Sequence, residues 1–565
     1  MPTFENYTYE RPDLELEKDK FNGLLHAFTR AGSHEEATQA IEAINGFRNR
    51  LSTLFNLVLI RASINTKDEF YQGERDFFDE IEPELQALST AFYKELVKSP
   101  YREQLEEQWG TQLFDIADLE IKAFSTEVIQ LLQRENRLSS EYSKLVASAE
   151  VEFQGNTYTL AQLAPFTQNK DRAVRKQAVE ASTGFFEQHA DKLDDIYDQL
   201  VKTRHEIATS LGYKDFVELG YIRMLRIDYD AKMVDVFRKQ VRDSIVPLVS
   251  KLYKKQADRI GVDPLKFYDE NFKFQSGNAE PKGSPEWIIE IGKKMYEELS
   301  AETNEFFHYM LDRNLMDLEA KKGKEAGGYC TFIEDYQSPF IFSNFNGTSE
   351  DIDVLTHEAG HAFQVYSSRK IGVPEYIFPT SEGAEIHSMS MEFFTWPWME
   401  LFFKEDADKY KYAHLADGLQ FLPYGVAVDE FQHLVYENPD WTPDERKRAW
   451  KKLEETYLPH RDYDGNPYLE TGGFWQRQGH IYEDPFYYID YTLAQICAFQ
   501  FWKRSREDQQ DAWQDYYNLC KLGGSKPFLE LVEAANLHSP FEEGTVESVV
   551  KTIEDWLNAV DDKAL

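Results

Sequence analysis

The chain has 565 residues, of which 42% are hydrophobic and 15% aromatic, a composition that can fill a large core. Its formal net charge is −38 at pH 7 and no basic stripe offsets it, so we expect no nucleic-acid partner. No run approaches the roughly 18 apolar residues of a membrane helix, and the N-terminus lacks a signal-peptide pattern, so we expect a cytoplasmic protein with no membrane partner.

Helical periodicity dominates the first half of the chain. Ser33-His34-Glu35-Glu36 has the pattern of a capping box and predicts a long helix through Leu59. Gly155-Asn156 predicts a short β-hairpin within residues 151–160. Further helices are expected at about 68–98, 103–148, 171–209, 231–260 and 285–318. No linker composition forces a boundary, so we expect an N-terminal helical region, 1–200, and a second region, 201–565, in one continuous body.

Two β-rich segments come next along the chain. Residues 327–333 and 339–347 flank a short polar loop, which predicts a hairpin. Cys330, Cys497 and Cys520 are odd in number and have no CxxC spacing, which indicates reduced thiols rather than a disulfide framework.

The most informative stretch is His357-Glu358-Ala359-Gly360-His361, an HExxH pattern on a predicted helix. Positions 357 and 361 lie about one turn apart on one face, so both imidazoles can reach one metal ion. Glu358 is offset from that face and stays free to act as a base. Thr348-Ser349-Glu350-Asp351 predicts a capping box at the start of this helix, and Gly372 with Pro374 ends it. Catalytic zinc has three protein ligands in such sites and keeps a fourth position open.

An acidic third ligand is expected on the following helix, which begins near Ser381. Glu385 and Glu392 are seven residues apart and share a face, so one can bind the metal while the other hydrogen-bonds a ligand histidine. His387 points away from Glu385 around the helix and is a candidate for the wall of the substrate site. Asp429-Glu430-Phe431-Gln432-His433 has half of an HExxH pattern, but its first residue favours a structural network over a second metal site.

These motifs resemble those of the thimet-oligopeptidase-like metallopeptidases, in particular the oligoendopeptidase F and Pz-peptidase branch. The resemblance is carried by HEAGH at 357–361, EIHSMSME at 385–392, GGFWQRQGH at 472–480 and PFYYIDY at 485–491. Length and motif order also agree, so it covers essentially the whole chain. It implies a mainly α fold, with a large helical body enclosing a deep cleft, a zincin-type HExxH core and a small β element.

The resemblance also implies residue roles and one zinc ion as cofactor. The residues implied at the metal are His357, His361 and Glu385 as zinc ligands, Glu358 as the general base and Glu392 beneath the ligands. His480 and Tyr491 are implied as donors to the substrate carbonyl and its oxyanion. These two roles have a physical rationale, because peptide hydrolysis builds negative charge on that oxygen.

The aromatic run before Tyr491 leaves the identity of the tyrosine donor open. Tyr482, Tyr487 and Tyr488 are the alternatives if the alignment shifts by a register. Tyr487 and Tyr488 equally suit packing in a helical core, where a tyrosine hydroxyl is often bonded.

The strand at residues 327–333 is a second place where substrate contacts are expected. By the resemblance it borders the cleft and pairs with an extended peptide, which makes Gly328, Tyr329 and Cys330 candidates for substrate binding. A purely structural hairpin is the alternative.

Three functions fit the sequence. The first is a zinc-dependent endopeptidase that hydrolyses internal bonds of short, unfolded oligopeptides in the cytosol. The second is an HExxH metallocarboxypeptidase, which needs a cation for a free carboxylate, and Arg461 and Arg477 are candidates by position. The third is a noncatalytic peptide-binding protein, which the presence of Glu358 disfavours because binding requires no general base.

Overall fold

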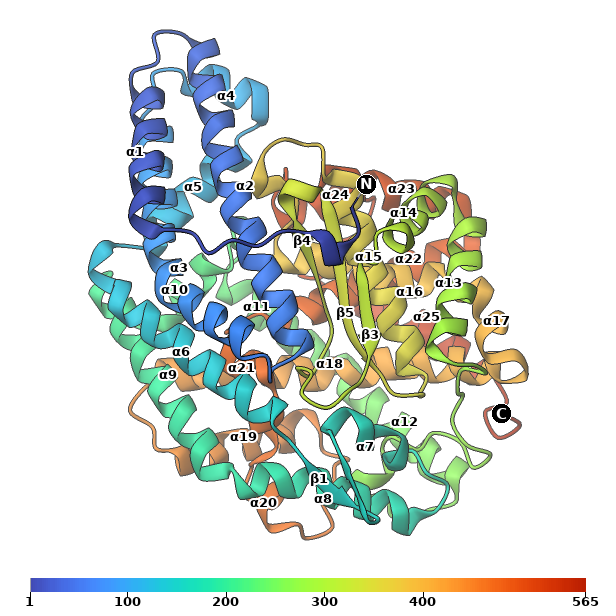
Figure 1. Cartoon of the computed structure of the whole chain (residues 1–565). Coiled ribbons are helices and arrows are strands. Elements are labelled where there is room, and N and C mark those ends of the chain that lie inside the picture. The colour runs from blue at the N-terminus through green and yellow to red at the C-terminus, as the bar shows by residue number, and fades with distance from the viewer. Residues whose placement is uncertain (1) are drawn as a thin grey trace.

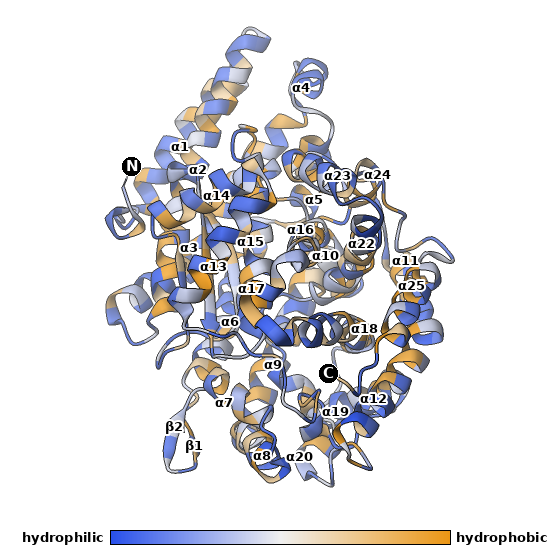
Figure 2. Ribbon diagram, turned by 90° about the vertical axis from the view of Figure 1, so that its right-hand side faces the viewer, coloured by the Kyte–Doolittle hydropathy of each residue, from blue (hydrophilic) through white to orange (hydrophobic). Residues whose placement is uncertain are grey.

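The computed structural model describes residues 2–565, and helices surround a small sheet (Figure 1), which confirms the mainly α fold expected from the sequence. The N-terminal helices α1 (Leu14–Thr29), α2 (His34–Ile64) and α4 (Arg102–Trp109) project beyond the rest of the molecule in both views (Figures 1 and 2). Ser33 caps α2 as predicted, since its side chain accepts from the Glu36 amide. The Glu36 carboxylate reaches the Gly32 amide at 2.7 Å, one residue before the predicted partner.

Several predicted long helices are divided by turns that local sequence did not reveal. Gly110 has φ +85° and ends α4, so the span 103–148 holds α4, α5 (Gln112–Ala123) and α6 (Ile129–Ala147). The span 171–209 holds α8 (Arg172–Gln188) and α9 (Ala190–Ser210). The predicted span 68–98 is the single helix α3 (Glu69–Leu96), and the predicted hairpin is β1 (Val151–Phe153) with β2 (Asn156–Tyr158).

The sheet contains one strand that the sequence analysis assigned to a helix. The predicted helix 285–318 is α13 (Pro285–Leu299) and α14 (Ala301–Asp312), and then Asn314 turns the chain at φ 52° into β3 (Met316–Glu319). The strands β4 (Tyr329–Ile333) and β5 (Ser338–Phe345) form the predicted antiparallel hairpin. The order is β3-β5-β4 with β3 parallel to β5, so β4 is an edge strand.

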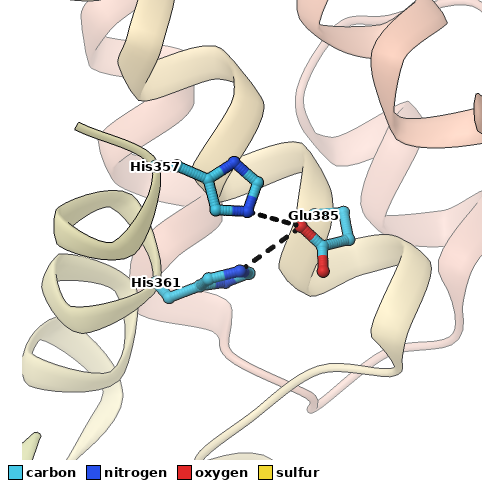
Figure 3. Close-up of side chains that lie close together, drawn as sticks. All are labelled: His357, His361 and Glu385. Carbon is cyan, nitrogen blue, oxygen red and sulfur yellow. Dashed lines mark ion pairs between the residues drawn. The ribbon is translucent and has the colours of Figure 1, made fainter. Parts of the chain in front are cut away.

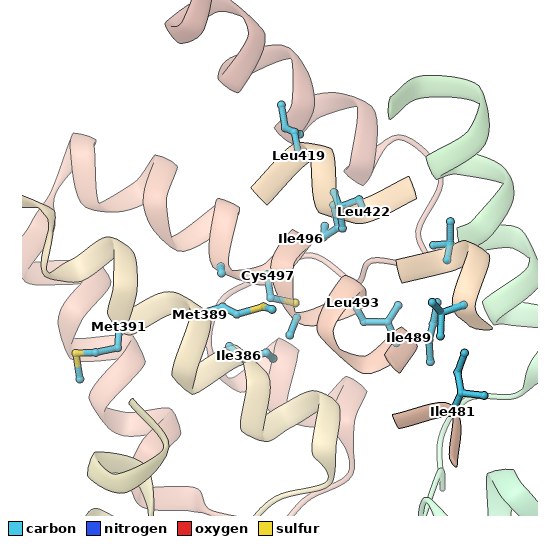
Figure 4. Close-up of a cluster of buried hydrophobic side chains, with 14 of the residues drawn as sticks. Ile386, Met389, Met391, Leu419, Leu422, Ile481, Ile489, Leu493, Ile496 and Cys497 are labelled. Carbon is cyan, nitrogen blue, oxygen red and sulfur yellow. The ribbon is translucent and has the colours of Figure 1, made fainter. Parts of the chain in front are cut away.

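The centre of the molecule is built from α15 (Glu350–Ser368), α16 (Ser381–Phe394), α18 (Ala407–Glu437) and α22 (Tyr488–Glu507). Helix α16 packs between α15 and α22, and α15 also lies against β5. Apolar side chains of α16, α18, α21 (Gly479–Glu483) and α22 meet in a buried cluster (Figure 4), which makes α16 a rigid support for the residues on its other face.

The predicted capping box at Thr348-Ser349-Glu350-Asp351 is wrong. Ser349 is itself in a helical conformation and its side chain makes no cap. The Asp351 carboxylate instead accepts from the amides of Asn346, at 2.8 Å, and Gly347, at 2.9 Å. It therefore holds the turn between β5 and α15 rather than the first turn of the helix.

The remaining helices close the body around this core. They are α7 (Leu160–Thr167), α10 (Phe216–Arg223), α11 (Ala231–Gln240), α12 (Val246–Ile260), α17 (Met399–Phe403), α19 (Pro443–Tyr457), α20 (Pro467–Glu470), α21 (Gly479–Glu483), α23 (Gln509–Leu522), α24 (Phe528–Ala534) and α25 (Thr545–Ala559). Within residues 2–565, none of the helices has the length and apolar character needed to cross a bilayer.

One hydrophobic cluster links the two regions expected from the sequence. It contains Phe4 and Leu57 together with Leu355 and Leu557, so buried contacts run continuously across residue 200. This continuity supports one body, whereas the boundary at residue 200 stays a prediction.

Candidate metal centre

Three of the predicted ligand side chains meet between α15 and α16 (Figure 3). Glu385 Oε2 lies 3.2 Å from His357 Nε2 and 3.3 Å from His361 Nε2. The candidate ligand atoms all lie within 4.8 Å of one another. A tetrahedral zinc ion with bonds of about 2.0–2.1 Å holds its ligand atoms about 3.3 Å apart, so the three side chains fit one zinc ion.

The crossing of the two helices depends on Gly360, the fourth residue of the HExxH motif. A Cβ at this position would lie 2.7 Å from the His387 carbonyl oxygen and 2.7 Å from Ser388 Cα, both backbone atoms of α16. Any other residue would push the helices apart. The glycine therefore allows Glu385 to stand opposite the two histidines.

Glu392 fixes the tautomer of His357. Its Oε1 lies 2.7 Å from His357 Nδ1, so Nδ1–H donates to the carboxylate and the Nε2 lone pair faces the centre. Glu392 Oε2 lies 2.7 Å from His414 Nε2, and the Trp396 indole donates to His414 Nδ1 at 3.2 Å. His414 and Trp396 were missed by sequence reasoning, because neither belongs to a motif or shares a spacing with one.

The Glu385 carboxylate is held at both oxygens. Ser388 Oγ lies 2.7 Å from Oε2, and the Tyr487 hydroxyl donates to Oε1 at 2.7 Å. Burial raises the pKa of Glu385, but the two histidines outweigh it and hold that pKa well below its ordinary value. Glu385 is therefore an anion. Ser388 could have been found from the sequence, since it follows Glu385 by one helical turn.

The centre favours a positive charge. Burial lowers the pKa of His357, but its hydrogen bonds to Glu385 and Glu392 outweigh burial and raise that pKa well above its ordinary value. The buried Glu385 carboxylate thus favours a cation beside the two Nε2 atoms, and a divalent metal ion meets that requirement.

Glu358 lies on the same helix, turned towards the strand side of the centre. A Cβ on Gly328 would lie 3.2 Å from Glu358 Oε1, so the backbone before β4 forms the wall beside this carboxylate. Glu358 is buried, which raises its pKa, and its Oε2 has no hydrogen-bond partner within residues 2–565. A buried carboxylate oxygen without a protein partner is suited to accept a proton from a bound molecule.

A chain of hydrogen bonds directs His480 and Tyr491. The Tyr424 hydroxyl donates to Gln478 Oε1 at 2.8 Å, which turns the Gln478 amide nitrogen to His480 Nδ1 at 2.9 Å. His480 Nδ1 then accepts, so the proton sits on Nε2, 3.1 Å from the Tyr491 hydroxyl oxygen. That oxygen accepts from His480, and its own proton is left for another acceptor. Burial lowers the pKa of His480, which keeps the ring neutral.

Comparison with known proteins identifies the family of this chain. Residues 4–124 match the model of the peptidase M3 N-terminal domain, and residues 165–550 match that of peptidase family M3. The chain belongs to peptidase family M3. This M3 peptidase is 21% identical to oligopeptidase PepF of Bacillus subtilis over 579 aligned residues, which cover 96% of this chain and 82% of the relative. It is 24% identical to an oligoendopeptidase F homolog of Borreliella burgdorferi over 462 residues, 76% of this chain and 75% of the relative.

A solved structure agrees with the family assignment. The M3 peptidase is similar to Pz peptidase A, solved with an inhibitor, at 62% identity and a TM-score of 0.99, covering 99% of this chain and 100% of that chain. The resemblance noted from the motifs is therefore confirmed. Together these relationships make the chain an oligopeptide-cleaving metalloendopeptidase.

Two candidates for substrate contact are buried in the core of the M3 peptidase, which corrects the expectation that they line the substrate site. His387 is fully buried, with Nδ1 3.6 Å from Cys520 Sγ, and burial lowers its pKa to about 3. The Tyr482 ring stacks on Tyr142 with centroids 4.0 Å apart, and its hydroxyl donates to the Leu193 carbonyl. Sequence spacing could not reveal this, because each side chain is covered by residues distant in the chain.

The candidates at strand β4 lie on opposite faces of the strand. Tyr329 stacks on Phe342 with centroids 4.8 Å apart and faces away from Glu358, whereas Gly328 and Cys330 are on the side of the strand that faces it. Tyr488 packs edge-on against Phe421 at 5.7 Å. The structure thus leaves Gly328 and Cys330 at the centre and places Tyr329 behind the strand.

The Asp429–His433 stretch forms a structural network in the M3 peptidase, as its first residue indicates. Arg238 donates to the Asp429 carboxylate at 2.6 Å, and His433 Nε2 lies 3.1 Å from the Tyr221 hydroxyl. The arginine already neutralises the carboxylate, so this pair is no second metal site.

Proposed function

We propose that the chain is a zinc-dependent endopeptidase that hydrolyses internal bonds of short, unfolded oligopeptides in the cytosol, with His357, His361 and Glu385 as zinc ligands. The observation that supports this most is the meeting of three ligand atoms within 4.8 Å. A bound zinc ion would supply a Lewis acid that activates water and polarises the scissile carbonyl.

The residues around the ion have separate tasks in this proposal. Glu358 accepts the proton of the attacking water through its unpaired Oε2 and later delivers a proton to the leaving amine. The Tyr491 hydroxyl, oriented by His480, donates to the oxygen of the carbonyl as negative charge develops there. Glu392 keeps His357 in the tautomer that presents Nε2.

One observation removes a candidate cation of the carboxypeptidase alternative, and a second bears on the location of the enzyme. Arg461 donates to both oxygens of Glu270, at 3.2 and 3.0 Å, so it is engaged and not free for a terminal carboxylate. Cys330, Cys497 and Cys520 are all free thiols, which suits a reducing compartment such as the cytosol.

Peptides blocked at both ends and carrying an internal fluorescence quencher test the proposal directly. We expect cleavage at internal bonds and about one zinc ion per chain. Glu358→Gln should keep the zinc but lose about 10²–10⁴ in kcat, because the amide has a similar shape and is a poor base. Glu385→Ala should lose the zinc. Cleavage that requires a free C-terminus would favour the carboxypeptidase, and undiminished zinc affinity in Glu385→Ala would move the ligand to another carboxylate of α16, Glu382 or Glu392.

A further inference from the structure

A cavity of about 600 Å³ opens beside the metal centre. Gly328, where a Cβ would meet Glu358, and Gln478, which bonds His480, both line it. The cavity therefore begins at the catalytic groups. Its wall continues to Arg477, the residue next to Gln478.

Arg477 is the one cation of this cavity that lacks an ionic partner within residues 2–565. The other, Arg461, is engaged by Glu270. The exposed Arg477 guanidinium lies 5.3 Å from the centre of the Phe474 ring, which supports its plane and leaves its N–H donors free. Of the cavity's own carboxylates, Asp351 is occupied by two backbone amides, and Glu350 forms no ion pair with Arg477 within the same described range.

A second cavity, of about 1060 Å³, has the opposite character. Its arginines are engaged: Arg48 by Glu375, Arg75 by Glu325 and Arg223 by Glu135. Its lining carboxylates outnumber them and are Asp79, Glu82, Glu120, Glu135, Glu334, Glu375, Glu483 and Asp484. Tyr487, which bonds Glu385, also lines it, so this acidic cavity reaches the metal centre too.

The edge strand β4 connects the two cavities. Gly328, just before the strand, lines the Arg477 cavity, and Glu334, just after it, lines the acidic cavity. Six residues of extended chain span about 20 Å. A peptide lying along β4 would thus have its two ends in cavities of different charge.

The backbone of β4 has room for such a peptide. The Ile341 amide of β5 bonds the Leu315 carbonyl on the β3 side, so the alternate residues of β5 bond β4. Cys330 of β4 pairs with Ile341 and therefore turns its own amide and carbonyl to the open edge of the sheet. The neighbouring Phe332 carbonyl on that edge is taken by Asn56 of α2, at 2.8 Å. The open part of the edge lies at the end of β4 nearer Gly328.

Strand direction and charge agree on how a peptide would lie. A peptide paired antiparallel to β4, the more stable arrangement, has its N-terminal end near Glu334 and its C-terminal end near Gly328. Its amine would then enter the acidic cavity and its carboxylate would approach Arg477. Resting on the proposed endopeptidase function, we propose that Arg477 binds a carboxylate of the oligopeptide on the C-terminal side of the scissile bond.

Three internally quenched peptides of one sequence, each blocked at the N-terminus, test this: one with a free C-terminal acid, one with a C-terminal amide, and one amide with Asp replacing Asn after the scissile bond. For the wild type, we expect the free acid or the Asp peptide to exceed the plain amide about tenfold in kcat/KM, mainly through KM. In Arg477→Gln that ratio should fall to about one, and Arg477→Lys should retain most of it. Arg448→Gln, which removes an exposed arginine outside the cavity, should leave the ratio unaltered.

The outcomes separate the proposals. A response limited to the free acid identifies the terminal carboxylate, and a response of the Asp peptide identifies a side chain. Both support the inference. Equal kcat/KM for all three peptides in the wild type, or a ratio unchanged in Arg477→Gln, overturns it while leaving the endopeptidase intact. Failure of the wild type to cleave any of the peptides overturns the proposed function itself.

Discussion

Hydrogen bonds to single residues set the protons on both sides of the metal centre. On one side, Trp396 and His414 orient Glu392, which holds the Nδ1 proton of His357. On the other side, Gln478 accepts from Tyr424 and sets the tautomer of His480. Because a tautomer depends on the partner of the other ring nitrogen, both histidines are prepared before substrate arrives.

Substitutions of the tyrosines in the aromatic run should affect different properties, either kcat or zinc affinity. Tyr491→Phe removes a donor that matters as charge develops, so kcat should fall about 10²–10³-fold while zinc affinity holds. Tyr487→Phe removes the bond to Glu385, so zinc affinity should fall. Steady-state kinetics and competition with a chelator measure the two effects.

Tyr482→Phe is the matched control, because its hydroxyl bonds a carbonyl within the core at 3.4 Å, and kcat should stay near the wild-type value. If Tyr488→Phe instead removes turnover while Tyr491→Phe does not, the donor lies one register away from Tyr491.

At the scale of elements, the site depends on how closely two helices cross. The periodicity of α15 and α16 places their polar residues on one face each, but Gly360 decides the distance between the faces. Helix α22 packs on the side of α16 opposite to α15 and so holds α16 in place.

Gly360→Ala should therefore weaken zinc binding by at least about tenfold, because a Cβ 2.7 Å from backbone atoms of α16 forces the helix to move. Gly46→Ala is the matched control. It lies within α2 with nothing within 4 Å of the new Cβ, so it should raise the free energy of unfolding by about 0.5–1 kcal/mol and leave zinc binding unchanged. Wild-type zinc affinity in Gly360→Ala would show that the two helices can move apart without disturbing the metal ligands.

At the scale of the whole molecule, a large hydrophobic core extends from Phe4 to Leu557 within a strongly acidic chain of net charge −38. Ionisable groups are buried throughout it, and they shift in opposite directions. Burial raises the pKa of Asp79 to about 6 and lowers that of His460 to about 4. The pH dependence of unfolding is thus a sum of opposing contributions, and single variants are needed to separate them.

The contribution of His460 to the pH dependence of unfolding can be measured separately. It stacks on Tyr253 with centroids 3.9 Å apart, and neither ring nitrogen has a hydrogen-bond partner within residues 2–565. Its pKa is lower in the folded chain, so the unfolded chain binds more protons below about pH 6.5. The stability it contributes is present above about pH 6.5 and is lost as pH falls towards 4, by about 3 kcal/mol.

His460→Phe keeps the stacking and cannot titrate, so its urea midpoint should fall less than that of the wild type between pH 6.5 and 4. The difference between the two proteins is the measurement, because the other ionisable groups cancel in it. Parallel curves for the two proteins would contradict the assigned burial of a neutral His460.

The sequence by itself determined what depends on local periodicity and residue chemistry. The 3.6-residue repeat puts His357 with His361, and Glu385 with Glu392, on shared faces, and it predicts most helices. The two β-rich segments around a short polar loop predict the β4–β5 hairpin. The HExxH chemistry predicted a metal, and the ordered motifs predicted the family. These inferences need only neighbours in the chain.

Tertiary structure alone decided what depends on residues far apart in the chain. It separated the positions of Glu385, facing both Nε2 atoms, and Glu392, facing Nδ1, since equal spacing on one helix cannot distinguish them. It also buried His387 and Tyr482, and it brought His414 and Gln478 to the centre. The physical reason is that packing between helices sets distance and burial, and neither is encoded within a single helical turn.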